Sequence, residues 1–177
     1  GAPLALPEHA TVACHAAIDM QNRNEEMRQM LREQNRPLLF TRMGLNSGPV
    51  VVGNMGSADR MDYTMMGDVV NLAARLEGAN KFYKTFTMIS GSTYELAKDD
   101  IDSRQLDIIR VVGKKEPVHV YEVLARKNET GSEMSGVVEQ YLKGLKLYQD
   151  RNFADAVKEF EKVLDIDPED GPSLTYV

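Results

Sequence analysis

The sequence predicts an α+β fold with a largely antiparallel sheet, followed by an α-helical hairpin. Helical and strand-like segments alternate over residues 1–126, which is typical of a mixed sandwich. Two β-rich runs flank the turn Gly113-Lys114-Lys115-Glu116, as expected of a β-hairpin. After residue 135 the apolar residues recur only at helical spacing, which indicates two amphipathic helices.

The composition indicates a globular protein and excludes several other classes. The chain has 177 residues, of which 42% are hydrophobic and 27% charged, as in a soluble globular protein. It contains no apolar run long enough to cross a bilayer, so we expect a cytoplasmic location, although a longer parent protein could carry a membrane anchor. The single cysteine, Cys14, excludes a disulfide framework and is expected to be buried in a helix. A net charge of −6 argues against general nucleic-acid binding.

The charge is distributed unevenly and divides the chain into two units. Residues 1–126 hold 15 basic and 16 acidic side chains, whereas residues 127–177 hold 6 and 11. The seam is polar and lacks hydrophobic periodicity, so it is typical of a linker. We therefore expect a first unit at 1–126, a linker at 127–135 and a helix pair at 136–177.

The first unit contains the following predicted elements. Helices are expected at 8–34, at 69–79 with Asp68 as N-cap, and at Ser92–Lys98. Strands are expected at Leu38–Met43, Pro49–Val52, Asp62–Met66, Thr85–Ile89, Ile108–Val112 and Pro117–Val123.

The helix at 69–79 has unusual polar residues. It is apolar on nearly every side, which predicts a buried helix, yet Asn71 and Arg75 interrupt it four residues apart and therefore share one face. A buried guanidinium needs an anionic partner. That partner is either a carboxylate of the fold or a ligand such as a phosphate.

The second unit matches a tetratricopeptide repeat at several positions. Gly144, Ala156, Phe160 and Pro168 occupy its small, small, aromatic and proline positions, although Lys143 stands where a leucine is expected. One repeat cannot bury its own apolar face. We expect it to dock on the first unit or to begin a longer array.

Several motifs in order resemble the catalytic domain of class III nucleotidyl cyclases. They are Arg42–Ser57, Asp62–Gly78, Val112-Gly113-Lys114 and Pro117–Glu122. The resemblance covers most of residues 1–126 and implies the C-terminal two-thirds of that domain, a partial ferredoxin-like sandwich. The order of the two units most resembles that of bacterial adenylate cyclases with C-terminal tetratricopeptide repeats.

The resemblance implies roles for four residues. Asn71 would orient the ribose and Arg75 would stabilise negative charge on the phosphates, which answers the question of its partner. Thr64 matches the base-recognition position, where Asp or Thr accompanies adenine, so ATP is favoured over GTP. Lys114 loosely matches a lysine that binds the triphosphate. The family also implies a second protomer, because two antiparallel protomers form the active sites at their interface.

The resemblance places the metal ligands elsewhere. Two aspartates that hold Mg²⁺ or Mn²⁺, and an adenine-contacting lysine, would lie upstream of Gly1, so we predict no metal ligand in this chain. Asp62 and Asp68 do not match those ligands; a surface carboxylate and a helix cap are expected instead. The intact parent is expected to convert ATP to cyclic AMP and pyrophosphate, and this fragment alone is expected to be inactive.

Other functions of the chain remain possible from the sequence. The parent could be a degenerate cyclase that serves as a nucleotide-binding or dimerisation module, or the repeat could serve as an adaptor for a protein partner. A Walker phosphate loop is disfavoured, because no Gly-Lys-Ser/Thr follows Gly44, Gly48, Gly53 and Gly56; these glycines are expected to shape a hairpin.

Overall fold

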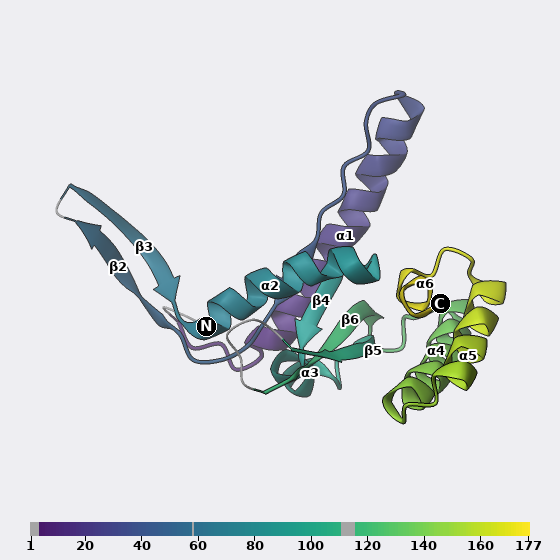
Figure 1. The fold of residues 1–177 in the computed structure, drawn as a ribbon. Helices are drawn as coiled ribbons and strands as arrows, with labels where there is room; N and C mark the ends of the chain where they lie inside the picture. The colour runs from purple at the N-terminus through teal and green to yellow at the C-terminus, as the bar shows by residue number, and fades with distance from the viewer. Residues whose placement is uncertain (1–3, 58, 111–115) are drawn as a thin grey trace.

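The computed structural model describes residues 4–57, 59–110 and 116–177. Its helices are α1 (His9–Glu33), α2 (Asp68–Tyr83), α3 (Gly91–Ala97), α4 (Ser132–Gln149), α5 (Phe153–Ile166) and α6 (Gly171–Tyr176) (Figure 1). Its strands are β1 (Met43–Leu45), β2 (Val51–Ser57), β3 (Arg60–Met66), β4 (Thr87–Ser90), β5 (Ile101–Ile109) and β6 (Val118–Arg126). Among these residues, no helix is both long and apolar enough to cross a membrane.

Four strands form the main sheet in the order β1-β4-β6-β5. β1 and β4 run parallel, whereas β6 is antiparallel to both β4 and β5. The predicted α+β class with a mostly antiparallel sheet is therefore confirmed. The predicted hairpin is present, but β5 begins at Ile101 rather than Ile108, because β6 pairs with it from Ile101 to Ile109, with irregularities at 102/103 and 105/107. Residues 111–112 of the predicted strand lie outside the described residues.

The predicted strand Leu38–Met43 is wrong for most of its length. The strand β1 begins only at Met43, whose N–H donates to the carbonyl of Phe86 at 2.7 Å. Residues 38–42 instead run back along the projecting end of α1 (Figure 1), where Leu39 and Phe40 are exposed. A β-rich run becomes a strand only where a neighbouring strand takes up its backbone groups.

Helices cover both faces of the main sheet. Met88 and Ile89 are successive buried residues of β4, so their side chains point to opposite faces. Ile89 packs with α1 and α3, and Met88 packs with α2. The two clusters are Ala10, Cys14, Ile18, Ile89, Ala97, Ile101 and Val123 on one face, and Leu72, Leu76, Tyr83, Met88, Leu106 and Val120 on the other. The predicted burial of Cys14 is confirmed.

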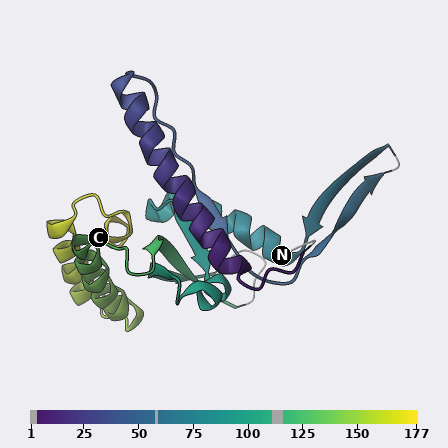
Figure 2. The same cartoon turned by 180° about the vertical axis from the view of Figure 1, so that it is seen from behind.

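β2 and β3 form a separate two-stranded ribbon that projects away from the sheet (Figures 1 and 2). Its register runs from Val51 opposite Met66 to Ser57 opposite Arg60. Gly56 has a φ of +146°, and an added Cβ would lie 2.0 Å from the carbonyl oxygen of Arg60, so glycine is required there. The expected role in a hairpin is thus confirmed for Gly56, whereas Gly53 lies on β2 with nothing within 4 Å of an added Cβ. For Gly44 and Gly48 the expectation is wrong, because Gly44 belongs to β1 of the main sheet and Gly48 to the loop before β2.

The C-terminal helices α4 and α5 form a hairpin with its own apolar core. Gly144 faces the ring of Phe160, and a Cβ there would approach Phe160 Cε1 to 2.8 Å. α4 begins at Ser132, inside the stretch 127–135 that we expected to be a linker, because the first turn of a helix needs no apolar periodicity of its own. The predicted helical hairpin is present and docks on the sheet, where the hydroxyl of Tyr141 donates to the carbonyl of Leu106 at 2.8 Å.

Candidate nucleotide site on helix α2

The candidate site is built on α2, which follows the ribbon directly. Gly67 has a φ of +155° and takes the N-cap position, so Asp68 is the first helical residue and not the predicted N-cap. The glycine permits a backbone turn that a residue with a Cβ resists, and the helix therefore starts one residue earlier than expected. Asp68 still places an acidic side chain in the first turn, where the helix dipole favours negative charge.

α2 buries one stripe and not its whole circumference. The buried residues are Leu72, Leu76, Asn80 and Tyr83, which recur at helical spacing and face the main sheet. Asn71 is exposed and Arg75 is half-buried. The expectation of a fully buried helix with a buried guanidinium is corrected, because α2 lies on a single face of the sheet and its Asn71 side faces outward.

Asn71 and Arg75 nevertheless lie together as predicted. They are four residues apart on one continuous helix, so their side chains are neighbours one turn apart. An amide that can both donate and accept thus lies beside a five-donor cation. This pair can bind a polar, negatively charged molecule at the surface of α2.

Hydrogen bonds from two asparagine side chains fix α2 on the sheet. Asn46, just after β1, donates to the carbonyl of Val69 in the first turn of the helix at 2.9 Å. The hydroxyls of Ser90 and Ser92 donate to the Asn46 side-chain oxygen at 2.6 and 3.1 Å, which holds that amide in place. At the other end, Asn80 donates to the carbonyl of Met43 at 2.9 Å.

Between these contacts, α2 lies directly on the backbone of β1. A Cβ added at Gly44 would lie 2.2 Å from the carbonyl oxygen of Ala73 and 2.3 Å from the amide nitrogen of Glu77. Our sequence reasoning assigned no role to Asn80. An asparagine within the apolar stripe 72, 76, 80 and 83 is the signal that would have revealed it, since buried amides are retained where they are hydrogen-bonded.

Thr64 and Lys114 are the other two predicted site residues. Thr64 lies on β3 opposite Gly53, three residues before Gly67, and its side chain is exposed. The ribbon therefore places Thr64 just ahead of the helix that carries Asn71 and Arg75. Lys114 lies outside the described residues.

The described residues do not fit a metal ion. In the ranges 4–57, 59–110 and 116–177, no three His, Cys, Asp or Glu side chains lie together in a way that could hold one. Asp62 is an exposed carboxylate 3.7 Å from the Arg60 side chain, as expected of a surface acid.

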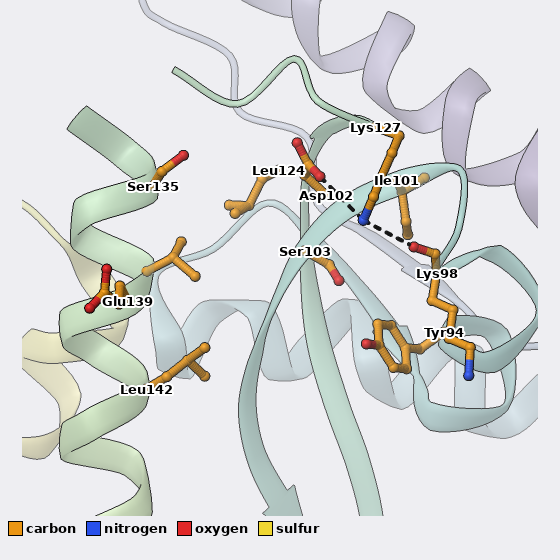
Figure 3. Close-up of a pocket in the computed structure, with 11 residues that line it drawn as sticks. Tyr94, Lys98, Ile101, Asp102, Ser103, Leu124, Lys127, Ser135, Glu139 and Leu142 are labelled. Atoms are coloured by element: carbon orange, nitrogen blue, oxygen red, sulfur yellow. Dashed lines mark hydrogen bonds and ion pairs between the residues drawn. The ribbon is translucent and has the colours of Figure 1, made fainter. Parts of the chain in front are cut away.

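Two cavities of the described structure are lined by residues other than the predicted site residues. A cavity of about 350 Å³ lies between α4 and the α3–β5–β6 side of the sheet (Figure 3). Its two lysines are already paired: Lys98 lies 2.6 Å from Glu95, and Lys127 lies 3.6 Å from Asp102. A second, mainly apolar cavity of about 460 Å³ lies between α1, β1 and α2. Asn71, Arg75 and Thr64 line neither of these two cavities.

Comparison with known proteins identifies the first unit. Residues 1–125 match the adenylate and guanylate cyclase catalytic domain. Adenylate cyclase 1 from Rhizobium meliloti (strain 1021) is 38% identical over 123 residues, which cover 70% of this chain but only 18% of that protein. The chain thus spans less than a fifth of the length of this curated relative.

Two solved structures share the fold. The adenylyl cyclase CyaB from P. aeruginosa superposes with a TM-score of 0.64 at 36% identity, covering 74% of this chain and 67% of that one. The guanylate cyclase domain of RhGC from Catenaria anguillulae, solved in complex with GTP, gives a TM-score of 0.52 at 32% identity and covers 72% of this chain and 65% of that one. The chain therefore belongs to the adenylate and guanylate cyclase catalytic domain family.

Proposed function

We propose that this chain is part of an adenylate cyclase that converts ATP to cyclic AMP and pyrophosphate. The observation that carries the proposal is the Asn71–Arg75 pair, which lies one turn apart on the outward side of a helix held by Asn46, Gly44 and Asn80. A rigidly held donor pair at an open surface suits a nucleotide whose negative charge is redistributed during reaction. The relatives that are named adenylate cyclases support the same activity.

The roles of the two residues follow from their chemistry. In the proposed reaction the ribose 3′-oxygen attacks the α-phosphorus in line, the 3′-hydroxyl proton is lost, and the bond from the α-phosphorus to the pyrophosphate oxygen breaks. Negative charge grows on the pyrophosphate and the phosphoryl oxygens. Arg75 stabilises that charge with its guanidinium, and Asn71 holds the ribose so that its 3′-oxygen faces the phosphorus.

Thr64 and Lys114 are assigned to substrate recognition. Thr64 contacts the adenine from the base of the ribbon, and this assignment favours ATP over GTP. Lys114 contacts the triphosphate. The relatives include an adenylyl cyclase and a guanylate cyclase domain solved with GTP, so base preference needs its own measurement.

We assign the divalent cation, Mg²⁺ or Mn²⁺, to residues outside the described ones, because these hold no suitable cluster. Such an ion supplies positive charge that neutralises the triphosphate and makes the ribose hydroxyl easier to deprotonate. This chain contributes the guanidinium and the amide.

The ribbon and the open side of α2 are assigned to contact with a second protomer. Every residue of β3 is exposed, and four of them are large apolar side chains: Met61, Tyr63, Met65 and Met66. An isolated two-stranded ribbon is marginally stable in water, and an exposed apolar surface of this kind marks an interaction site. We expect Tyr63→Glu to raise the dimer dissociation constant at least about tenfold in sedimentation velocity, with Asp59→Asn, on the same ribbon, as the control. Wild-type affinity in Tyr63→Glu would exclude the ribbon as the contact.

A cyclase assay tests the function. Mg-ATP, Mn-ATP and Mg-GTP are supplied to this chain alone, to this chain mixed with its upstream segment, and to the intact protein with and without Arg75→Ala. We expect no turnover by the chain alone, cyclic AMP on mixing, and loss of activity in Arg75→Ala. An intact protein that binds ATP without turnover would support the degenerate-cyclase reading instead.

A protein-interaction role for the helical hairpin is a second candidate. It is favoured by the large apolar side chains that α4 and α5 leave exposed, which are Leu142, Tyr148, Phe153 and Ile166. If this surface binds a partner, Phe153→Glu abolishes recovery of one defined protein that wild type retains at micromolar concentration, while cyclase activity is unchanged. Equal retention by both proteins would remove this candidate.

A further inference from the structure

The C-terminal helix α6 contacts the catalytic-family domain and the α4–α5 hairpin at once. The ring of Tyr176 stacks on Phe160 of α5 with centroids 4.8 Å apart, and it also packs against the cluster that contains Leu72, Leu76 and Tyr83 of α2. Its hydroxyl donates to the carbonyl of Leu106 on β5 at 3.0 Å, the same carbonyl that accepts from Tyr141. One short helix thus joins both units.

A buried ion cluster holds the start of α6. Arg104 on β5 lies 2.6 Å from Glu122 on β6 and 2.7 Å from Asp170, the N-cap residue of α6. The Arg104 and Asp170 side chains are 3% and 2% exposed. Asp170 also accepts from the backbone N–H of Ser173 at 3.0 Å, so one carboxylate both caps α6 and ties it to the sheet.

The next residue, Gly171, lies directly against the C-terminal end of α2. A Cβ at this position would be 2.6 Å from the carbonyl oxygen of Tyr83 and 2.5 Å from Cβ of Lys84. The Thr175 hydroxyl also lies 3.2 Å from the carbonyl oxygen of Phe82, one of the last carbonyls of α2, which have no partner within the helix. At Gly171, therefore, no side chain fits between α6 and the end of α2.

The same uninterrupted helix connects this end of α2 to the candidate site. Arg75 and Tyr83 are eight residues apart on one uninterrupted helix, which is about 12 Å at the α-helical rise. Rigid secondary elements carry coupling between sites, so a shift at Tyr83 would displace Arg75 and Asn71.

We propose that Asp170 and Gly171 are positioning residues for the nucleotide site. Asp170 ties α6 to the ion cluster on β5 and β6, and Gly171 lies against the C-terminal end of α2. Together they act through α2 and fix where Asn71 and Arg75 stand. The C-terminal helical unit is then an integral support of the catalytic helix. This inference rests on the proposed cyclase function for its kinetic readout but not for its structural one.

The test uses two variants of the intact protein that contains this chain, each with a matched control. Gly171→Ala forces a methyl group against α2, and its control Gly136→Ala adds a methyl group on α4 where nothing lies within 4 Å. Asp170→Asn removes the charge but keeps an oxygen for the cap, and its control is Asp165→Asn, an exposed acid of α5. Each protein is assayed for kcat and KM with ATP and for amide hydrogen exchange of residues 72–83.

We expect Gly171→Ala to lower kcat between about tenfold and about 10²-fold with KM for ATP changed less than about twofold, since a shift of about 1 Å in a catalytic group has effects of this size. Asp170→Asn should lower kcat in the same direction, and both should speed exchange of residues 72–83 at least about fivefold relative to their controls. If kcat and the exchange of α2 stay at control values in both variants, the proposal is wrong. If the wild type makes no cyclic nucleotide, the proposed function fails, and the exchange measurement alone decides the positioning role.

Discussion

The buried cation Arg104 offers a sharp test of how the two units are joined. Its guanidinium lies 2.6 Å from Glu122 and 2.7 Å from Asp170, and it also lies 5.1 Å from the ring centroid of Tyr141. In the variant Arg104→Met two carboxylates stay in the interior without a cation. Removing one partner from a buried ion pair typically costs about 3–5 kcal/mol, because the remaining charge is both desolvated and uncompensated.

The assay is unfolding by urea and by heat at pH 7, each followed by circular dichroism. A loss of about 4 kcal/mol corresponds to a fall of roughly 8–16 °C in Tm for a chain of this size. The control is the variant with Arg104→Met, Glu122→Leu and Asp170→Asn together. It carries no unpaired charge, so most of the lost stability should return. A loss below about 1 kcal/mol in Arg104→Met would refute the assignment of this cluster as a buried ionic junction.

The same variant has a definite pH dependence. Burial raises the pKa of Glu122 above its usual value even beside Arg104, whose charge opposes that rise. A raised pKa in the folded state means that the stability contributed by the protonated carboxyl is complete at low pH and is lost as pH rises through the folded pKa. Without the cation this pKa rises further. The difference in free energy of unfolding between wild type and Arg104→Met should therefore shrink as pH falls from 7 toward 5. A deficit that stays constant over this range would contradict the electrostatic explanation.

Three further predictions concern single positions. Gly44→Ala should lower the free energy of unfolding in urea by about 1–3 kcal/mol, because the new methyl group meets the Ala73 carbonyl at 2.2 Å. Gly53→Ala, with nothing within 4 Å of the added methyl group, should lower it far less. Equal losses would show that the close approach to α2 is unimportant. Burial raises the pKa of the Cys14 thiol to about 11, so at pH 8 its alkylation by iodoacetamide should be roughly 100-fold slower than that of an ordinary cysteine; rapid labelling under native conditions would disprove its burial. Arg75→Ala in the intact cyclase should lower kcat about 10²–10³-fold, as loss of one preorganised charge-stabilising donor commonly does; a kcat within about tenfold of wild type would remove Arg75 from the transition state.

The elements that local pattern predicted best are the long helices. The helix expected at 8–34 is α1, His9–Glu33, and the apolar spacing of the C-terminal segment gave the α4–α5 hairpin. The β-hairpin was also found, although its first strand is longer than expected. Helical periodicity needs only neighbours in sequence, so it survives without knowledge of the tertiary structure.

The predictions were wrong where a residue's secondary structure or burial depends on a segment distant in the sequence. Leu38–Met43 has the composition of a strand but gains a sheet partner only at Met43. The helix that carries Arg75 is apolar almost all round, yet a single sheet face is available to cover it, so Arg75 is half-buried. Composition indicates what could be buried, and the arrangement of layers decides what is buried.

The sequence by itself determined the family and the pairing of Asn71 with Arg75, because ordered motifs and a four-residue helical spacing are properties of the local chain. Only the tertiary structure decided that Asp170 meets Arg104 across a separation of 66 residues and that Gly171 lies against the end of α2. No local pattern encodes such contacts. They follow from how whole layers pack, where a buried cation must find its carboxylates and two backbones can approach only where a side chain is absent.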